Sequence, residues 1–296
     1  MAQPREYFPF NPAAGKPLRL APTGAVDSQF HILGPRGKYR VRPDASYEMP
    51  TAVPGALRRM HEALGIERGI VVQTTTYGED HAVVLDALAE LGPGYKACAN
   101  ALVFESADDA YLQRLHEAGV RGARFAFRLG PGAGLARSTF DRAVGKIRDL
   151  GWYMKVQPGQ FGIVDRVSWF EHIDIPILID HMGRPDASLG PDRDPNIAKL
   201  RELLDRGNFW VMLSLGEKLS KTGPPWDDVL PLARAMIDAN PERCVWGSDW
   251  PHLGSTMAPP GDALLLDLMH RFVRDEAELR LIMVDNPSKL FGYAQV

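Results

Sequence analysis

Several apolar runs of this 296-residue sequence end in polar and charged side chains. These residues are Asp27, Gln29, His31, Thr74, Thr75, Thr76, Arg124, Gln157, Asp180, His181, Ser214 and Asp249. Imidazole and carboxylate groups transfer protons, and a guanidinium group binds anions through several N–H donors. If the apolar runs are strands whose ends meet, the set predicts acid–base chemistry on a small anionic molecule.

The segment VDSQFH at 26–31 is predicted to end the first strand. Because side chains alternate along a strand, Asp27, Gln29 and His31 are expected on one side. Metal-dependent hydrolases often have two histidines at this spacing, whereas this sequence has Gln29 in the first position. An amide oxygen is a poor ligand for zinc-like ions, so Gln29 disfavours a divalent metal site and we expect no cofactor. The alternative for His31 is a strand-end histidine bonded to a neighbour.

Two further segments place ionisable groups at strand ends. LIDHMGRP at 178–185 presents His181, while Asp180 is expected to point to the opposite side and orient a neighbour. WGSDWPH at 246–252 puts Asp249 at the end of the last strand. With His31 and His181 nearby, a general base is a better interpretation of Asp249 than a helix cap. His252 follows three residues later and is expected to line the pocket.

The elements that must position these groups alternate regularly along the chain. Apolar, β-branched runs predict strands at 25–32, 69–75, 95–102, 122–127, 153–157, 177–181, 209–214 and 244–249. Amphipathic patterns predict helices at 56–64, 81–91, 108–118, 139–150, 164–172, 197–206, 227–238 and 262–273. Eight β-then-α units predict a single (β/α)₈ TIM barrel at 24–296, preceded by an N-terminal arm at 1–23. The alternative, a doubly wound open sheet, lacks its glycine-rich dinucleotide turn.

Composition excludes several classes of protein. The chain has 34 Lys+Arg against 37 Asp+Glu, a net charge of −3, which gives no basic field for nucleic acid or a membrane surface. No apolar run approaches ~18 residues, and the first residues lack the apolar region of a signal peptide. Cys98 and Cys244 lie in apolar segments and form no disulfide framework. We expect a soluble cytoplasmic protein, a monomer or small homo-oligomer.

The segments VDSQFH, LIDHMGRP and WGSDWPH together resemble the amidohydrolase superfamily, and more narrowly its 2-pyrone-4,6-dicarboxylate lactonase-like branch. The resemblance covers the chain from about Gly24 to Phe291. It implies that Asp249 activates the hydrolytic water, and that His31 and His181 polarise a lactone carbonyl. It also implies a set of substrate-binding residues, in which Thr75 replaces a serine and Lys218 replaces an arginine: Arg124, Tyr47, Thr75 and Lys218.

Two positions depart from that branch. Gln29 replaces a histidine and Gln157 replaces a substrate-binding tyrosine, and glutamine at both places is similar to D-galactarolactone isomerase of the same superfamily. That relative has Asn where this chain has Asp249. Arg128, two residues past a strand end, is either a second anion contact or a solvated loop charge.

The leading hypothesis is therefore a hydrolase that opens a small carboxylated lactone, a 2-pyrone-4,6-dicarboxylate-like or sugar-acid lactone, without a metal. The alternatives are a sugar-acid lactone isomerase, a metal-dependent amidohydrolase-type decarboxylase, and a barrel that binds a sugar acid without turning it over.

Overall fold

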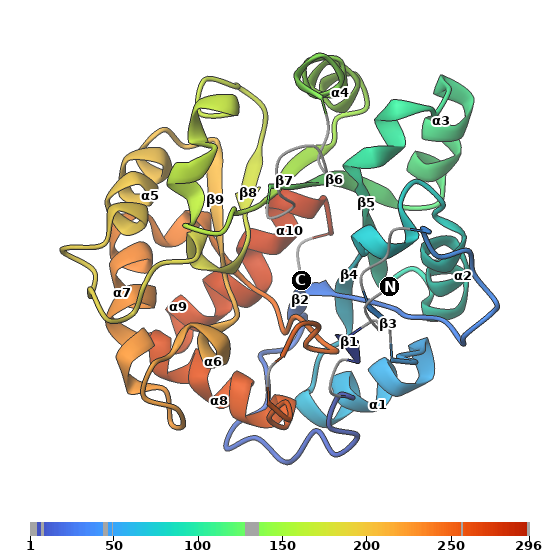
Figure 1. The fold of residues 1–296 in the computed structure, drawn as a ribbon. Helices are drawn as coiled ribbons and strands as arrows, with labels where there is room; N and C mark the ends of the chain where they lie inside the picture. Colours follow the sequence, from blue (N-terminus) through green and yellow to red (C-terminus); the bar gives the residue numbers. More distant parts are fainter. Residues whose placement is uncertain are drawn as a thin grey trace.

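The computed structural model describes residues 5–6, 9–43, 47–48, 50–127, 136–255 and 257–294. Eight parallel strands form one sheet in the order β10-β9-β8-β7-β6-β5-β4-β2. They are β2 (Val26–Phe30), β4 (Arg68–Val72), β5 (Tyr95–Asn100), β6 (Val120–Ala126), β7 (Tyr153–Gln157), β8 (Ile177–Ile179), β9 (Phe209–Leu213) and β10 (Cys244–Trp246). The sheet closes where Phe30 pairs with Trp250, and where the Asp249 N–H donates to the Gln29 carbonyl at 2.9 Å. The predicted (β/α)₈ barrel is confirmed (Figure 1).

Helices surround this barrel (Figure 1). They are α1 (Pro54–Leu64), α2 (Ala82–Leu91), α3 (Asp109–Glu117), α4 (Arg137–Asp149), α5 (Pro195–Asp205), α6 (Gly216–Leu219), α7 (Leu230–Ala239), α8 (Asp262–Phe272), α9 (Glu276–Arg280) and α10 (Asn286–Phe291). Short 3₁₀ turns fill several connections, among them η1 (Thr75–Tyr77) and η5 (His181–Gly183). A two-stranded parallel pair, β1 (Arg5–Glu6) with β3 (Tyr47–Glu48), lies apart from the barrel sheet.

One predicted helix is wrong. The stretch 164–172 forms two 3₁₀ turns, η3 (Ile163–Asp165) and η4 (Val167–Trp169), instead of an α-helix. The Asp165 carboxylate accepts the Phe161 N–H at 2.9 Å, a local bond that competes with helical hydrogen bonding. The helix predicted at 227–238 begins as a 3₁₀ turn, η6 (Asp227–Val229), before α7.

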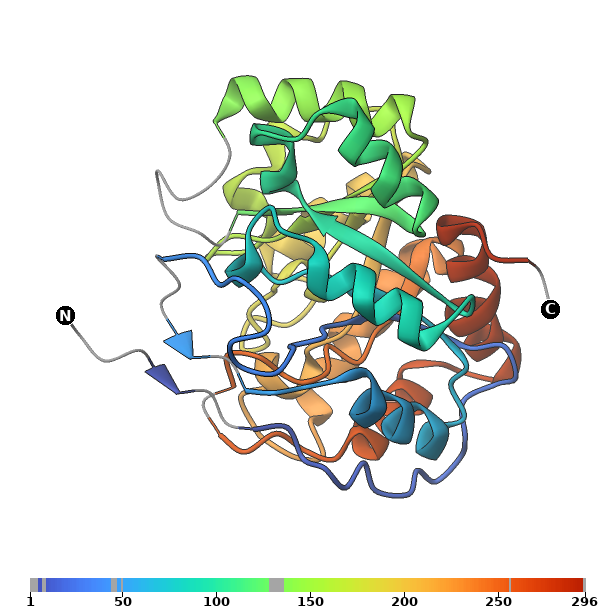
Figure 2. The ribbon, with the colours of Figure 1, turned by 90° about the vertical axis from the view of Figure 1, so that its right-hand side faces the viewer.

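The end of the chain adds structure that periodicity did not predict. After α8 come α9, a π-helical turn at Leu281–Asp285 (η8), and α10. Phe291 of α10 packs with the interior side chains of the strands, including Val26, Ile70 and Tyr153. Figure 2 shows this C-terminal segment at one end of the barrel and the strands β1 and β3 at the other. Since α10 closes one end, the other end is the open mouth.

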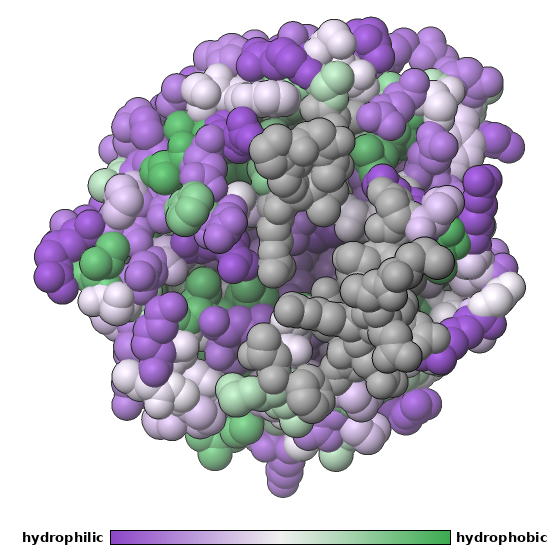
Figure 3. Space-filling view, viewed as in Figure 1, coloured by the Kyte–Doolittle hydropathy of each residue, from purple (hydrophilic) through white to green (hydrophobic). Residues whose placement is uncertain are grey.

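The interior beneath the mouth is apolar. The buried side chains of this cluster are Val26, Ile70, Val72, Cys98, Tyr153, Leu178, Trp210, Met212, Val245 and Phe291. This layer leaves no space for chemistry in the lower barrel, so polar groups gather above it at the carboxyl ends of the strands. The face in Figure 3 is hollowed at its centre, and residues visible inside the hollow are hydrophilic.

The N-terminal segment follows the outside of the barrel. The Ala21 N–H donates to the Leu64 carbonyl at the end of α1, and the Ala14 carbonyl accepts the N–H of Ala263 in α8. The division into an arm at 1–23 and a barrel from 24 stays a prediction. In the part of the chain that the structure describes, no helix is long and apolar enough to span a bilayer.

Candidate active site

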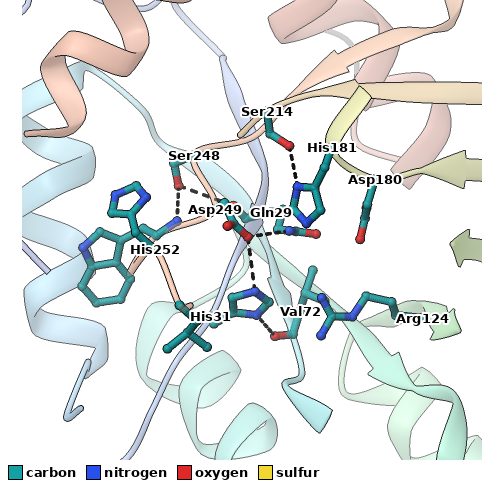
Figure 4. Close-up of polar contacts among 12 residues, drawn as sticks. Gln29, His31, Val72, Arg124, Asp180, His181, Ser214, Ser248, Asp249 and His252 are labelled. Atoms are coloured by element: carbon teal, nitrogen blue, oxygen red, sulfur yellow. Dashed lines mark hydrogen bonds and ion pairs between the residues drawn. The ribbon is translucent and has the colours of Figure 1, made fainter. Parts of the chain in front are cut away.

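Asp249 stands at the mouth, three residues after the end of β10, and Figure 4 shows Gln29 and His31 beside its carboxylate. Its Oδ1 accepts from Gln29 Nε2 at 2.7 Å and lies 3.5 Å from His31 Nε2. Its Oδ2 lies 3.1 Å from the Nζ of Lys218 in α6. The structure thus brings four of the predicted site residues together although they come from distant parts of the sequence.

The charge of Asp249 follows from these neighbours. Burial by itself would raise the pKa of its carboxyl group, but the Lys218 ammonium, together with His181 and His31, outweighs burial. The pKa of Asp249 is held well below its usual range, so the group is a carboxylate at neutral pH. An ionised, nearly buried carboxylate at a barrel mouth can accept a proton from water.

The two histidines beside Asp249 are held by different partners. His31 Nδ1 lies 2.6 Å from the Val72 carbonyl, and because a carbonyl only accepts, Nδ1 carries a proton. Its Nε2 therefore donates only when the ring is doubly protonated. His181 Nδ1 lies 2.9 Å from Ser214 Oγ. Burial lowers the pKa of His181 to about 4, so this ring is neutral at pH 7 and can offer one N–H.

Unusual backbone conformations occur in the turns that carry His181 and Asp249. Left-handed φ angles occur at His181 (56°), Met182 (53°), Arg184 (57°), Asp249 (58°) and His252 (63°). A non-glycine residue in this region costs roughly 1–3 kcal/mol, and such residues cluster at functional sites. The segments LIDHMGRP and WGSDWPH therefore adopt turns that packing of the surrounding barrel must hold in place.

Asp27 does not share a face with Gln29 and His31, so that prediction is wrong. The register of β2 against β4 shifts between Asp27 and Phe30, and such a bulge breaks the strict alternation of side chains. The Asp27 carboxylate instead lies 3.2 Å from the Nε2 of His61 in α1 and accepts from Ser248 Oγ at 2.5 Å. Asp27 thereby fixes the residue that precedes Asp249.

Arg124 lies in the interior, two residues before the end of β6, and has few partners. Its Nη2 donates to the Gln73 carbonyl at 3.2 Å. Among the described residues no carboxylate lies within ion-pair distance of its guanidinium, and the two acidic candidates, Asp27 and Asp180, are paired elsewhere. Most of its N–H donors thus remain for a ligand at the mouth.

Asp180 lies inside the barrel, so the prediction that it points to the opposite side is wrong. Leu178, two residues earlier, belongs to the interior cluster, and alternation puts Asp180 on the same face. Its Oδ1 lies 2.7 Å from the Nζ of Lys155, and both side chains are fully buried. Sequence reasoning missed Lys155, although its place between Tyr153 and Gln157 in β7 puts it on the interior face.

The remaining predicted site residues differ in how they are placed. Gln157 ends β7 and Thr75 begins η1, and both are half-buried. Of Tyr47 only the backbone, in β3, is described, and Arg128 lies outside the described residues. His252 turns toward α8, with its Nε2 3.0 Å from Asp262 Oδ1.

Nitrogen groups, rather than further carboxylates, lie beside both oxygens of Asp249. The Asp249 oxygens, where a cation would bind, already face the Gln29 amide nitrogen and the Lys218 ammonium. Within the described ranges no three His, Cys, Asp or Glu side chains gather as possible metal ligands. An ammonium group beside the carboxylate supplies the positive charge that a metal ion would otherwise bring.

Comparison with known proteins gives a consistent set of relatives. The sequence model of a family described as amidohydrolase matches residues 26–293. The 4-sulfomuconolactone hydrolase of Hydrogenophaga intermedia is 35% identical, over 93% of this chain and 91% of the relative. The 2-pyrone-4,6-dicarboxylate hydrolase of Comamonas testosteroni is 33% identical, over 95% and 94%. The D-galactarolactone isomerase of Agrobacterium fabrum is 32% identical, over 93% of both chains.

Solved structures agree with the barrel. A protein of Agrobacterium tumefaciens, solved in its apo form, superposes with a TM-score of 0.81 at 30% identity. The superposition covers 95% of this chain and 100% of that one. The match therefore covers nearly the whole of this chain.

Proposed function

Because this chain belongs to the amidohydrolase family, we propose that it is a lactonase that hydrolyses a small carboxylated lactone, with Asp249 as the base that activates water. One observation carries the proposal: an ionised, nearly buried carboxylate stands with His31, Gln29 and Lys218 at the mouth of the barrel that also presents Arg124. Three relatives at 32–35% identity carry names of enzymes that act on lactones, which supports the substrate class.

The proposed reaction adds one water molecule across the ring ester. Asp249 accepts a proton from water while the water oxygen attacks the lactone carbonyl carbon. His181, through its free N–H, and His31, when doubly protonated, donate hydrogen bonds to the carbonyl oxygen as it gains negative charge. The ring C–O bond then breaks, and Asp249 returns its proton to the leaving oxygen, so the product is an open-chain hydroxy acid.

Lys218 and Arg124 are proposed to bind the anionic part of the substrate. A guanidinium can meet a carboxylate with two parallel hydrogen bonds, whereas the ammonium acts as a point charge. A carboxylate with a strongly lowered pKa is a weak base. When Lys218 turns from Asp249 to a substrate carboxylate, the pKa of Asp249 rises and its basicity increases.

A panel of lactones in ¹⁸O-labelled water tests the reaction. Hydrolysis places one ¹⁸O atom in the new carboxylate, which mass spectrometry and ¹³C NMR both detect. We expect label uptake from carboxylated lactones and little from neutral lactones of the same ring size. A panel in which no lactone is opened or rearranged, with the protein folded, would leave only a binding barrel.

Metal independence is part of the proposal and needs its own test. Since the Asp249 oxygens face Lys218 and Gln29, exhaustive chelation is expected to leave kcat unchanged. Elemental analysis of the purified protein should find less than one bound transition metal per chain. Activity lost to a chelator and restored by zinc or manganese would favour the metal-dependent decarboxylase-type alternative.

Lactone isomerisation is the second candidate, favoured by the amides of Gln29 and Gln157 and by the 32% identity to D-galactarolactone isomerase. In that reaction a hydroxyl group of the substrate replaces water as the nucleophile. The ring size then changes without uptake of ¹⁸O, so the same panel separates the two reactions. Amide side chains suit a sugar-acid lactone, which carries several hydroxyl groups.

A further inference from the structure

Lys155 is a buried cation that the proposed reaction does not use. It lies in the middle of β7, fully buried, with its Nζ 2.7 Å from Asp180 Oδ1 and 3.7 Å from Met212 Sδ. A lysine is almost never fully buried unless it is paired, because its charge must leave water. Its partner is likewise fully buried, so the pair is sealed within the barrel.

The register of three strands places this pair beside Arg124. Arg124 of β6 and Lys155 of β7 are direct partners across the sheet, and Lys155 is in turn the partner of Leu178 in β8. Asp180 follows Leu178 by two residues, on the same interior face. The interior row therefore runs from a guanidinium through an ammonium to a carboxylate.

Because Lys155 lies between Arg124 and Asp180 in this row, the Asp180 carboxylate neutralises Lys155 rather than Arg124. A buried carboxylate without a partner is strongly unfavourable, and Arg124 is the next cation along the row. Asp180 forms its ion pair with Lys155. The structure accordingly has no ion pair between Asp180 and Arg124 among the described residues. The Asp27 carboxylate likewise has other partners, the His61 ring and the Ser248 hydroxyl group.

We infer that Lys155 is a positioning residue: by neutralising Asp180 it keeps the Arg124 guanidinium available for a substrate carboxylate. The inference rests on the proposed function, in which Arg124 binds the anion. Its distinctive consequence is that the two members of one ion pair affect anion binding with opposite signs. Removal of Lys155 leaves a carboxylate that attracts Arg124, whereas removal of the Asp180 charge leaves an extra cation near the anion.

Binding of isophthalate, a flat dicarboxylate without a lactone, tests this without relying on turnover. Titration calorimetry would compare the wild type with Lys155→Met, Asp180→Asn and the double variant, with neutral isophthalamide as the control ligand. Met212→Leu serves as the matched control, because it perturbs packing beside Lys155 without changing a charge. Unfolding curves for each variant show whether the protein is folded at the assay temperature.

We expect Lys155→Met to bind isophthalate roughly tenfold or more weakly than the wild type. Asp180→Asn should bind it at least as tightly as the wild type. The double variant, which again has no net charge at this place, should return to within about threefold of the wild type. Met212→Leu and the isophthalamide titrations should show no such pattern.

A merely structural role predicts a different result. If the pair only stabilises the barrel, both single variants weaken isophthalate binding in parallel with their loss of stability, and the inference is overturned. If Lys155→Met does not fold, Asp180→Asn and the double variant decide: a tenfold weaker affinity in the double variant contradicts the inference. If the wild type opens no lactone, but Lys155→Met and Asp180→Asn still change isophthalate binding in opposite directions, only the proposed function is contradicted.

Discussion

Two lysine–aspartate pairs lie at the carboxyl ends of the barrel strands, and they differ in exposure. Lys218 and Asp249 are 3.1 Å apart, with side chains 19% and 8% exposed. Lys155 and Asp180 are 2.7 Å apart, and both side chains are 0% exposed. The first lysine belongs to the short helix α6 after β9, whereas the second is in the middle of β7.

The difference in exposure suits the Lys218–Asp249 pair to contact with a ligand and the Lys155–Asp180 pair to a constant structure. Asp249 also accepts a hydrogen bond from the Gln29 amide, so its carboxylate keeps a donor when Lys218 moves toward a ligand. Asp180 has no hydrogen bond from another described side chain, so it depends on Lys155. A lysine on a short helix at the rim can exchange partners, whereas a lysine held by strand register cannot. Exposure and element type, more than distance, distinguish the two pairs.

The largest effect on activity is expected at Asp249, the carboxylate of the more exposed Lys218–Asp249 pair. Asp249→Asn keeps the shape of the side chain but removes its ability to accept a proton from water. The lactonase kcat should fall roughly 10²–10⁴-fold, while isophthalate still binds. Steady-state kinetics on the best lactone of the panel measures this. A variant with nearly wild-type kcat would show that Asp249 is not the base, and would favour isomerisation.

Loss of the lysine should lower stability more in the buried Lys155–Asp180 pair than in the Lys218–Asp249 pair. Lys155→Met leaves the Asp180 charge buried alone and should lower the free energy of unfolding by about 3–5 kcal/mol. Lys218→Met removes a partly exposed ammonium from a carboxylate that keeps other donors, and should cost about 1 kcal/mol or less. Urea unfolding of both variants measures the contrast. Equal losses would mean that exposure does not distinguish the pairs.

Arg124, which belongs to neither pair, should affect charged substrates only. Arg124→Met should reduce kcat/KM for a carboxylated lactone by roughly 2–4 kcal/mol, by analogy with truncation of a buried charge pair. A neutral lactone of the same ring size should be nearly unaffected. Parallel assays of both lactones give the comparison, and equal losses on the two would assign Arg124 to the fold rather than to anion binding.

The smallest effect is a displacement of the pH profile. Since the pKa of Asp249 is held below its usual range, kcat/KM should stay level as the pH falls and decline only as the pH passes through that lowered pKa. Lys218→Met removes the principal group that lowers this pKa, so the acidic limb should move to higher pH. Lys218→Arg keeps the charge and should keep the limb near its wild-type position. An unmoved limb in Lys218→Met would contradict the assigned role of Lys218.

Sequence patterns predicted much of this arrangement because they report local properties. Apolar runs and amphipathic stretches located all eight barrel strands, and the fold brings Asp249, His31 and Gln29 together at their ends. Lys218, which only the family resemblance singled out, lies beside Asp249. The helix expected at 164–172 failed because Asp165 bonds to its own loop. Nothing local marked the bulge in β2 that turns Asp27 away from Gln29.

The sequence by itself determined the order of the elements and which ionisable residues stand at the ends of the strands. Only the tertiary structure decided which side chain each carboxylate meets: Lys218 for Asp249, Lys155 for Asp180, and His61 for Asp27. Partner choice depends on the register between strands and on the closure of β2 against β10. Those relations join residues as far apart as 220 positions, as between Gln29 and Asp249, and no local pattern encodes them.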